Sequence, residues 1–128
     1  MTGAHHPRNI KYHYVEWLSS FPWDTFVHLT WRKPTTLKLA KRHVERFLGF
    51  MGGRGIFGFE WGPIGGLLHV HGLVEGRSVS TEEAWRWWFE RHGRNAVQEV
   101  DPTKLRAGVK YVCKYALKGD LFEFLGAW

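Results

Sequence analysis

The sequence predicts an α+β fold, in which helices lie against an antiparallel β-sheet. Helix-like and strand-like segments alternate along the chain, and two of the strand-like runs are joined by a short connector, residues 62–66, that is rich in glycine and proline. Such a connector between apolar runs is typical of a hairpin. With 128 residues, 44% of them hydrophobic, the chain has the size and composition of one folded domain. We therefore interpret residues 1–128 as a single domain.

The first half of the chain predicts a helix, a strand and a second helix. Apolar residues recur at helical spacing over residues 9–21 and stop at Pro22, so we expect a packing helix within residues 1–22. Residues 25–31 are rich in β-branched and aromatic side chains, which indicates a strand. An apolar stripe with lysines and arginines outside it predicts an amphipathic helix over residues 35–51.

The second half predicts the remaining strands and helices. These are strands at 56–61 and 67–74, a helix at 81–92, a weaker strand at 96–100 and a final helix at 103–118. Ser80 and Glu83 have the spacing of a capping box, and Asp101 can cap the final helix. The tail, residues 121–128, would form an edge strand or coil. From the first strand onward the order β-α-β-β-α-β is related to the ferredoxin-like plan.

Charge and composition narrow the classes of function. The net charge is +6, the pI is about 9.7, and 16% of the residues are aromatic, including eight tryptophans. Positive charge with many rings favours nucleic acid, particularly single strands whose bases can stack. The single cysteine, Cys113, excludes an internal disulfide and a four-cysteine zinc finger. No apolar run is long enough for a membrane span or a secretory signal, so we expect a cytoplasmic protein without membrane contact.

The hairpin carries a candidate metal site. His69 and His71 lie two residues apart on one strand, so both imidazoles face the same side, about 6.6 Å apart along the strand. A turn centred near residues 64–65 would bring Glu60 opposite one of them, on the same face in either register. Three ligands of mixed type leave open coordination positions, as catalytic metal sites require. The alternative is a hydrogen-bonded His–Glu pair without metal. For His28, on the first strand, we expect a packed or supporting position.

The final helix carries a second polar stripe. Tyr111, Lys114, Tyr115 and Lys118 follow one another at helical spacing, which turns two phenols and two ammonium groups to one side. A phenol is a poor nucleophile at neutral pH, and neighbouring cations stabilise the phenolate and can hold a phosphate. In the simpler interpretation the tyrosines are boundary residues and the lysines are solvated.

Together these segments resemble the HUH endonuclease superfamily, specifically the rolling-circle replication initiators of phages and plasmids. The resemblance rests on His-Val-His at 69–71 followed by Tyr-x-x-Lys-Tyr-x-x-Lys at 111–118, with Phe-Val-His-Leu-Thr-Trp at 26–31 where that family has its first strand motif. It covers residues 25–118, which would form the catalytic core. Two tyrosines one helical turn apart are similar to the two-tyrosine branch of the family.

The resemblance implies a metal-assisted transesterification on single-stranded DNA or an origin hairpin. A divalent ion, Mn²⁺ or Mg²⁺, would be held by the two hairpin histidines and Glu60. Tyr111 would attack the scissile phosphate, leaving a 5′-phosphotyrosine on the protein and a free 3′-hydroxyl. Tyr115 would make a second cleavage, and Lys114 would neutralise the phosphate or the phenolate.

Other residues are expected to contact the DNA. The candidates are Lys118, Arg32, Lys33 and Trp87. For Trp85, Trp88 and Phe89 we expect core positions, and indeed for most of the tryptophans.

The chain contains no phosphate-binding G-x-x-x-x-G-K-[ST] loop, so unwinding and extension would require a host helicase and polymerase. Two other functions stay open. One is the strand transfer of an HUH transposase or relaxase, and the other is a non-catalytic single-strand-binding module on an RRM-like sheet.

Overall fold

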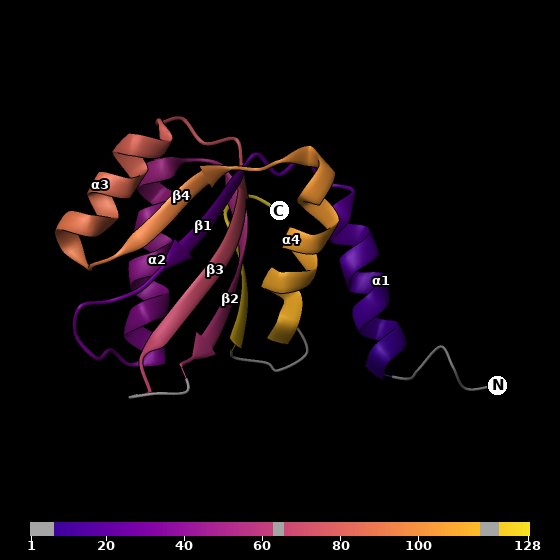
Figure 1. Ribbon diagram of the computed structural model, residues 1–128, viewed down its shortest axis with the longest axis horizontal. Helices are drawn as coiled ribbons and strands as arrows, with labels where there is room; N and C mark the ends of the chain where they lie inside the picture. The colour runs from indigo at the N-terminus through magenta and orange to yellow at the C-terminus, as the bar shows by residue number, and fades with distance from the viewer. Residues whose placement is uncertain (1–6, 63–65, 116–120) are drawn as a thin grey trace.

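The fold is a five-stranded antiparallel sheet with helices on both faces (Figure 1). This computed structural model describes residues 7–62, 66–115 and 121–128, with the backbone alone for residues 7–11 and 115. The helices are α1 (Pro7–Ser19), α2 (Leu37–Met51), α3 (Thr81–Arg91) and α4 (Leu105–Val112), with 3₁₀ turns η2 (Pro102–Lys104) and η3 (Cys113–Tyr115) on either side of α4. The strands are β1 (Thr25–Leu29), β2 (Arg54–Trp61), β3 (Leu68–Glu75), β4 (Asn95–Glu99) and β5 (Phe122–Leu125). The predicted α+β class is confirmed.

The strands lie in the order β4-β1-β3-β2-β5, and every neighbouring pair is antiparallel. The unit from β1 to β4 follows the predicted β-α-β-β-α-β order. The tail forms the edge strand β5 beside β2. Both strands of the predicted hairpin therefore lie inside the sheet, where their side chains meet helices on either face.

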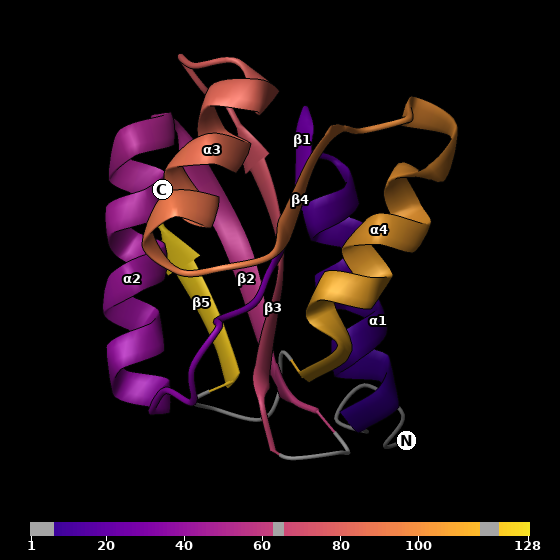
Figure 2. The ribbon, with the colours of Figure 1, turned by 60° about the vertical axis from the view of Figure 1, so that its left-hand side comes forward.

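Two hydrophobic cores lie on opposite faces of this sheet. Helices α2 and α3 cover one face, and α1 and α4 cover the other (Figure 2). Because side chains alternate along a strand, Val27 and Leu29 of β1 enter the α2/α3 core while His28 faces the α4 side. The capping box of Ser80 and Glu83 at the start of α3 forms as predicted.

A glycine in β2 allows α4 to approach the sheet closely. A Cβ atom on Gly58 would lie only 2.3 Å from the carbonyl oxygen of Val112 in α4. Gly58 is also the register partner of His71 in β3. The end of α4 is therefore held against the strand position beside His71.

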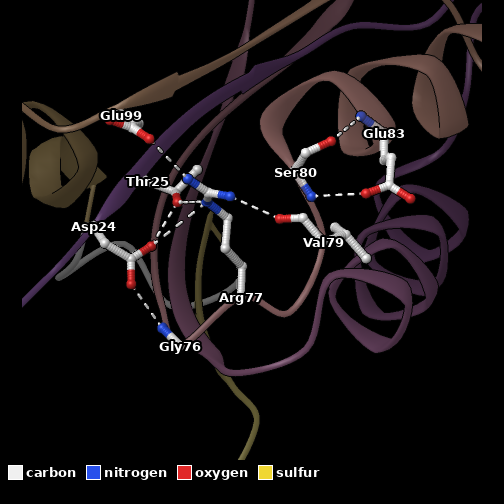
Figure 3. Close-up of polar contacts among 8 residues, drawn as sticks. All are labelled: Asp24, Thr25, Gly76, Arg77, Val79, Ser80, Glu83 and Glu99. Atoms are coloured by element: carbon white, nitrogen blue, oxygen red, sulfur yellow. Dashed lines mark hydrogen bonds and ion pairs between the residues drawn. The ribbon is translucent and has the colours of Figure 1, made fainter.

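A polar network around Arg77 joins the start of β1 to the ends of β3 and β4 (Figure 3). The Arg77 guanidinium donates to Thr25 Oγ1 at 2.6 Å and to the Val79 carbonyl at 2.7 Å, and forms ion pairs with Asp24 and Glu99. Asp24 also accepts from the backbone N–H of Gly76. These contacts fix the edge formed by β1 and β4 relative to the loop that enters α3.

The structure corrects the predicted final helix. α4 ends at Val112 and continues as the 3₁₀ turn η3, whereas the sequence pattern predicts one helix over 103–118. Tightening into a 3₁₀ turn is common where a helix ends. Residues 116–118 of the predicted helix lie outside the described residues.

Several aromatic residues are more exposed than the sequence pattern predicts. Trp88 is fully buried as expected, but Trp85 and Phe89 are each 39% exposed and stack on one another at 4.9 Å. Trp17 of α1 is also 50% exposed, although its ring lies 6.0 Å from that of Phe124 in β5. The expectation that most tryptophans belong to the core is wrong, because ring–ring stacking also shelters rings at the surface.

None of the described helices has both the length and the apolar character that crossing a bilayer requires.

Candidate functional site

The predicted hairpin site forms on the sheet face that α4 covers. β2 and β3 pair with Glu60 opposite His69, and His71 two residues further along β3 faces the same side. β1, the neighbour of β3, adds His28 directly opposite His71. Three imidazoles and one carboxylate from three adjacent strands therefore share one face.

His28 lies in contact with both of the other imidazoles. The His28 ring stacks on His71 with a centroid distance of 4.5 Å and lies 5.5 Å from the ring of His69. His28 Nε2 is 3.3 Å from His69 Nδ1, which is within hydrogen-bonding distance. His28 is thus a full member of the group. In the sequence, alternation along β1 indicates that His28 faces the side opposite to Val27 and Leu29. The sequence does not show that β1 lies next to β3, which is what brings His28 beside the other two histidines.

Tyr111 reaches this group from α4. Its ring meets His71 edge-on, with a centroid distance of 4.5 Å and an interplanar angle of 88°. The residue is 52% exposed, so its phenol is accessible to a ligand. The other tyrosine of the predicted pair, Tyr115, ends η3, and its side chain lies outside the described residues, as does Lys118.

Glu60 joins the helix to the histidines. Lys114 Nζ donates to Glu60 Oε2 at 2.9 Å, and Glu60 Oε1 lies 3.7 Å from His71 Nε2. The predicted phosphate-binding lysine therefore contacts the predicted metal ligand. In this arrangement the carboxylate both orients the ammonium group and faces the imidazole of His71.

The site keeps His71 neutral at physiological pH. Burial, followed by the nearby His28, lowers the pKa of His71 to about 4, against an opposing contribution from Glu60. The pKa of His28 is also lowered, chiefly by burial and then by His69. A neutral imidazole has a free nitrogen lone pair, which is the form that binds metal ions.

The donor set fits a divalent ion. Imidazole nitrogens with a carboxylate suit transition-metal ions such as Mn²⁺, and the buried Nδ1 of His71 has no hydrogen-bond partner. As the side chains stand, no three His, Cys, Asp or Glu residues within the described parts of the chain are gathered closely enough to hold an ion together. The residues that would supply ligands are His69, His71, Glu60 and His28.

Three hollows surround the group. A cleft of about 600 Å³, here the α4 cleft, lies between α4 and the β1–β4 edge, and His28, His71 and Tyr111 line it. A second hollow of about 480 Å³, the β1-end cleft, is lined by His28, His69 and Arg94. Beside Glu60 and Lys114 lies a niche of about 10 Å³, which is room for about one water molecule or ion. The imidazoles therefore stand where two clefts meet.

The other predicted DNA contacts lie away from this group. Trp87 belongs to α3, on the opposite side of the sheet, and stacks between Phe50 and the Arg91 guanidinium. Arg32 and Lys33 follow the end of β1, where the Arg32 guanidinium contacts Phe89. The structure thus brings together Glu60, His69, His71, Tyr111 and Lys114, and it separates Arg32, Lys33 and Trp87 from them.

Comparisons with known proteins found no matching family model, no matching curated protein and no matching solved structure.

Proposed function

We propose that this protein nicks and rejoins single-stranded DNA by transesterification through Tyr111. The observation that carries the proposal is the contact between the accessible Tyr111 ring and His71, at 4.5 Å, beside the Lys114–Glu60 pair. A nucleophile, a cation and a group of imidazoles thus meet at one exposed position. The resemblance of residues 25–118 to HUH replication initiators supports the same reaction.

In the proposed reaction, the phenolic oxygen of Tyr111 forms a bond to the phosphorus of a phosphodiester. The bond from phosphorus to the 3′ oxygen breaks, the phenol loses its proton to solvent, and the leaving 3′ oxygen takes one up. The product is a 5′-phosphotyrosine with a free 3′-hydroxyl. Because the ester bond is conserved in the covalent link, attack by a 3′-hydroxyl reverses the reaction and joins a strand.

The surrounding residues would prepare this step. A bound divalent ion would polarise the phosphate oxygens and neutralise their charge. His69, His71 and Glu60 would hold that ion, and His28, which lies against both histidines, would supply a further nitrogen ligand from β1. Lys114 would shift between Glu60 and the incoming phosphate, since both are anionic partners for one ammonium group.

Covalent capture of DNA tests the proposal. The protein is incubated with labelled single-stranded oligonucleotides of randomised sequence and Mn²⁺ or Mg²⁺, and adducts are separated on a denaturing gel. We expect a metal-dependent adduct that Tyr111→Phe abolishes. Tyr12→Phe is the matched control, because Tyr12 is a tyrosine of similar exposure, 55%, on α1 away from the imidazoles. This control should form the adduct at the wild-type rate.

Three outcomes would change the assignment. Absence of an adduct from the whole pool with metal present would rule out the nickase and leave a binding module if the oligonucleotides still bind. Full adduct formation by Tyr111→Phe with loss in Tyr115→Phe would make Tyr115 the nucleophile. An adduct that never rejoins to an added 3′-hydroxyl strand would exclude the joining step.

A further inference from the structure

A second polar hollow, here the basic pocket, lies beyond the end of β1. It has a volume of about 380 Å³ and is lined by Trp31, Arg32, Lys33, Arg91 and the two histidines His43 and His92, among others. None of the proposed reacting groups belongs to it. Its volume falls within the range of small-molecule and nucleotide sites.

The basic pocket has a preorganised wall. His43 and His92 stack with a centroid distance of 4.1 Å, and Trp31 Nε1 donates to His43 Nδ1 at 2.9 Å. Burial, followed by His43 and the neighbouring guanidinium groups, lowers the pKa of His92 to about 4. The imidazole of His92 is therefore neutral at pH 7, and the positive charge of the pocket comes from its arginines and lysine.

The charge around the basic pocket has one sign. Arg32, Lys33 and Arg91 line it, and Arg46 lies close enough to contribute to the pKa of His92. Among the described residues that line this pocket or the β1-end cleft, none is Asp or Glu. The α4 cleft, in contrast, includes Glu99 and Asp101. The basic pocket is thus suited to phosphate groups.

The α4 cleft, the β1-end cleft and the basic pocket adjoin one another, because each neighbouring pair shares a lining residue. His28 lines both the α4 cleft and the β1-end cleft, and Trp31 lines both the β1-end cleft and the basic pocket. Arg94 lines the β1-end cleft, which lies between the other two, and its carbonyl accepts a hydrogen bond from the backbone N–H of Thr30. A chain that occupies the site beside His71 can therefore continue past Arg94 to Arg32 and Arg91.

We propose that the basic pocket binds the phosphate backbone of the single DNA strand that flanks the reaction site. This inference rests on the proposed function for the identity of the strand, but the pocket would act as a binding site whether or not Tyr111 reacts. It also gives a role to Arg32 and Lys33, which follow the end of β1 and lie away from the imidazoles.

Strand length separates the two sites in an experiment. Fluorescence anisotropy is measured with labelled dinucleotides and with labelled single strands of about 20 nucleotides, in EDTA so that no covalent step occurs. A dinucleotide has one internucleotide phosphate and cannot place a phosphate in both sites at once, whereas the long probe can. The readout is the affinity for the long probe divided by the affinity for the dinucleotide.

We expect Arg91→Ala and Lys33→Glu each to lower this ratio by about three- to tenfold. The slope of log affinity against log salt for the long probe should become shallower by about 0.7 for each phosphate that the variant no longer binds. Arg86→Ala is the matched control, because it removes one guanidinium from the same helix while Arg86 pairs with Glu82 outside the pocket. Lys33 is exposed in a loop, so its substitution leaves the fold intact.

The outcomes for the two proposals are distinct. If variants in the basic pocket keep the wild-type affinity ratio and salt slope, the pocket does not bind the strand, even if the adduct forms. A lowered ratio without any adduct would retain the pocket and reject the nickase. If an unlabelled duplex of the same length competes with the long probe as well as an unlabelled single strand does, the proposal is also wrong, because it assigns the pocket to a single strand.

Discussion

At the scale of single residues, Gly58 sets how closely α4 approaches the sheet. In Gly58→Ala, the new Cβ would lie 2.3 Å from the Val112 carbonyl oxygen, so the helix must move away. We expect a loss of about 1–3 kcal/mol in the free energy of unfolding, as for other overpacked sites. Because Tyr111 precedes Val112, its ring should also leave His71 and adduct formation should fall. Urea denaturation and the adduct gel measure the two effects.

Gly49→Ala is the control for this substitution. Gly49 lies within α2, and a Cβ there would meet no atom within 4 Å. Alanine is the better helix former, so we expect this variant to be more stable by about 0.5–1 kcal/mol. Wild-type stability together with full adduct formation in Gly58→Ala would contradict the role given to the close approach.

Two histidines with lowered pKa values, the buried His71 and the partly buried His92, predict how stability depends on pH. The pKa values of His71 and His92 are both lowered to about 4, mainly by burial. These two histidines therefore bind a proton near pH 6.5 in the unfolded chain but only near pH 4 in the folded protein. The stabilisation is complete above pH 6.5 and is lost as the pH falls from 6.5 to 4. For His71, whose side chain is 11% exposed, the loss approaches about 3 kcal/mol.

Urea denaturation between pH 7.5 and pH 4.5, in EDTA, measures this dependence. His92→Gln should flatten the profile, because glutamine does not titrate and cannot contribute to the loss. An unchanged slope in that variant would show that His92 is not held neutral by the fold. The same series in His71→Gln isolates the contribution of the second imidazole.

At the scale of elements, Arg77 joins β1, β4 and the loop before α3 (Figure 3). Arg77→Met would keep most of the aliphatic side chain but remove the donors to Thr25 and Val79 and the pairing with Asp24 and Glu99. We expect a loss of about 1–3 kcal/mol in the free energy of unfolding, because the hydrogen bonds to Thr25 and to the Val79 carbonyl are partly buried. Arg86→Met, at an exposed i,i+4 pair, should change it by less than about 0.5 kcal/mol. Equal losses in the two variants would contradict a structural role for the network.

The elements themselves were largely predictable, because their signals are local. Apolar periodicity gave the helices and strands, and the period of two fixed Glu60, His69 and His71 on one face before any register was known. The strand order is not local, so the contact of His28 with both histidines could not be read from β1 alone. The end of α4 was also missed, since the helical stripe continues in sequence beyond Val112.

The exposed aromatic rings show a second limit of sequence patterns. Helical spacing assigns Trp85 and Phe89 to the same stripe as the buried Trp88, yet the two outer residues stack at the surface. The apolar face of α3 is wider than the part of it that α2 and the sheet cover. Which edge of the stripe stays exposed depends on how α3 sits against α2 and the sheet, which is a property of the tertiary structure.

At the scale of the whole molecule, the proposed ligands join three strands. β1, β2 and β3 each contribute to the group of imidazoles and carboxylate, so an ion bound there would link strands that the sheet otherwise joins through backbone hydrogen bonds. Unfolding separates these strands and disperses the ligands. An ion that binds only the folded chain therefore stabilises the fold as a whole, and the melting temperature reports its binding without reference to catalysis.

Thermal unfolding with and without Mn²⁺ tests the proposed ligands in this way. At about one hundred times the dissociation constant, an ion bound to the fold alone adds about 2.7 kcal/mol, which for a domain of this size raises the melting temperature by about 10 °C. His69→Ala should lose most of this rise, whereas His13→Ala, which removes an exposed histidine on α1, should retain it. The rise caused by the ion is compared within each variant, so any change in the stability of the metal-free protein cancels. An equal rise in both variants would remove His69 from the ligand set and would leave its contact with His28 as its structural role.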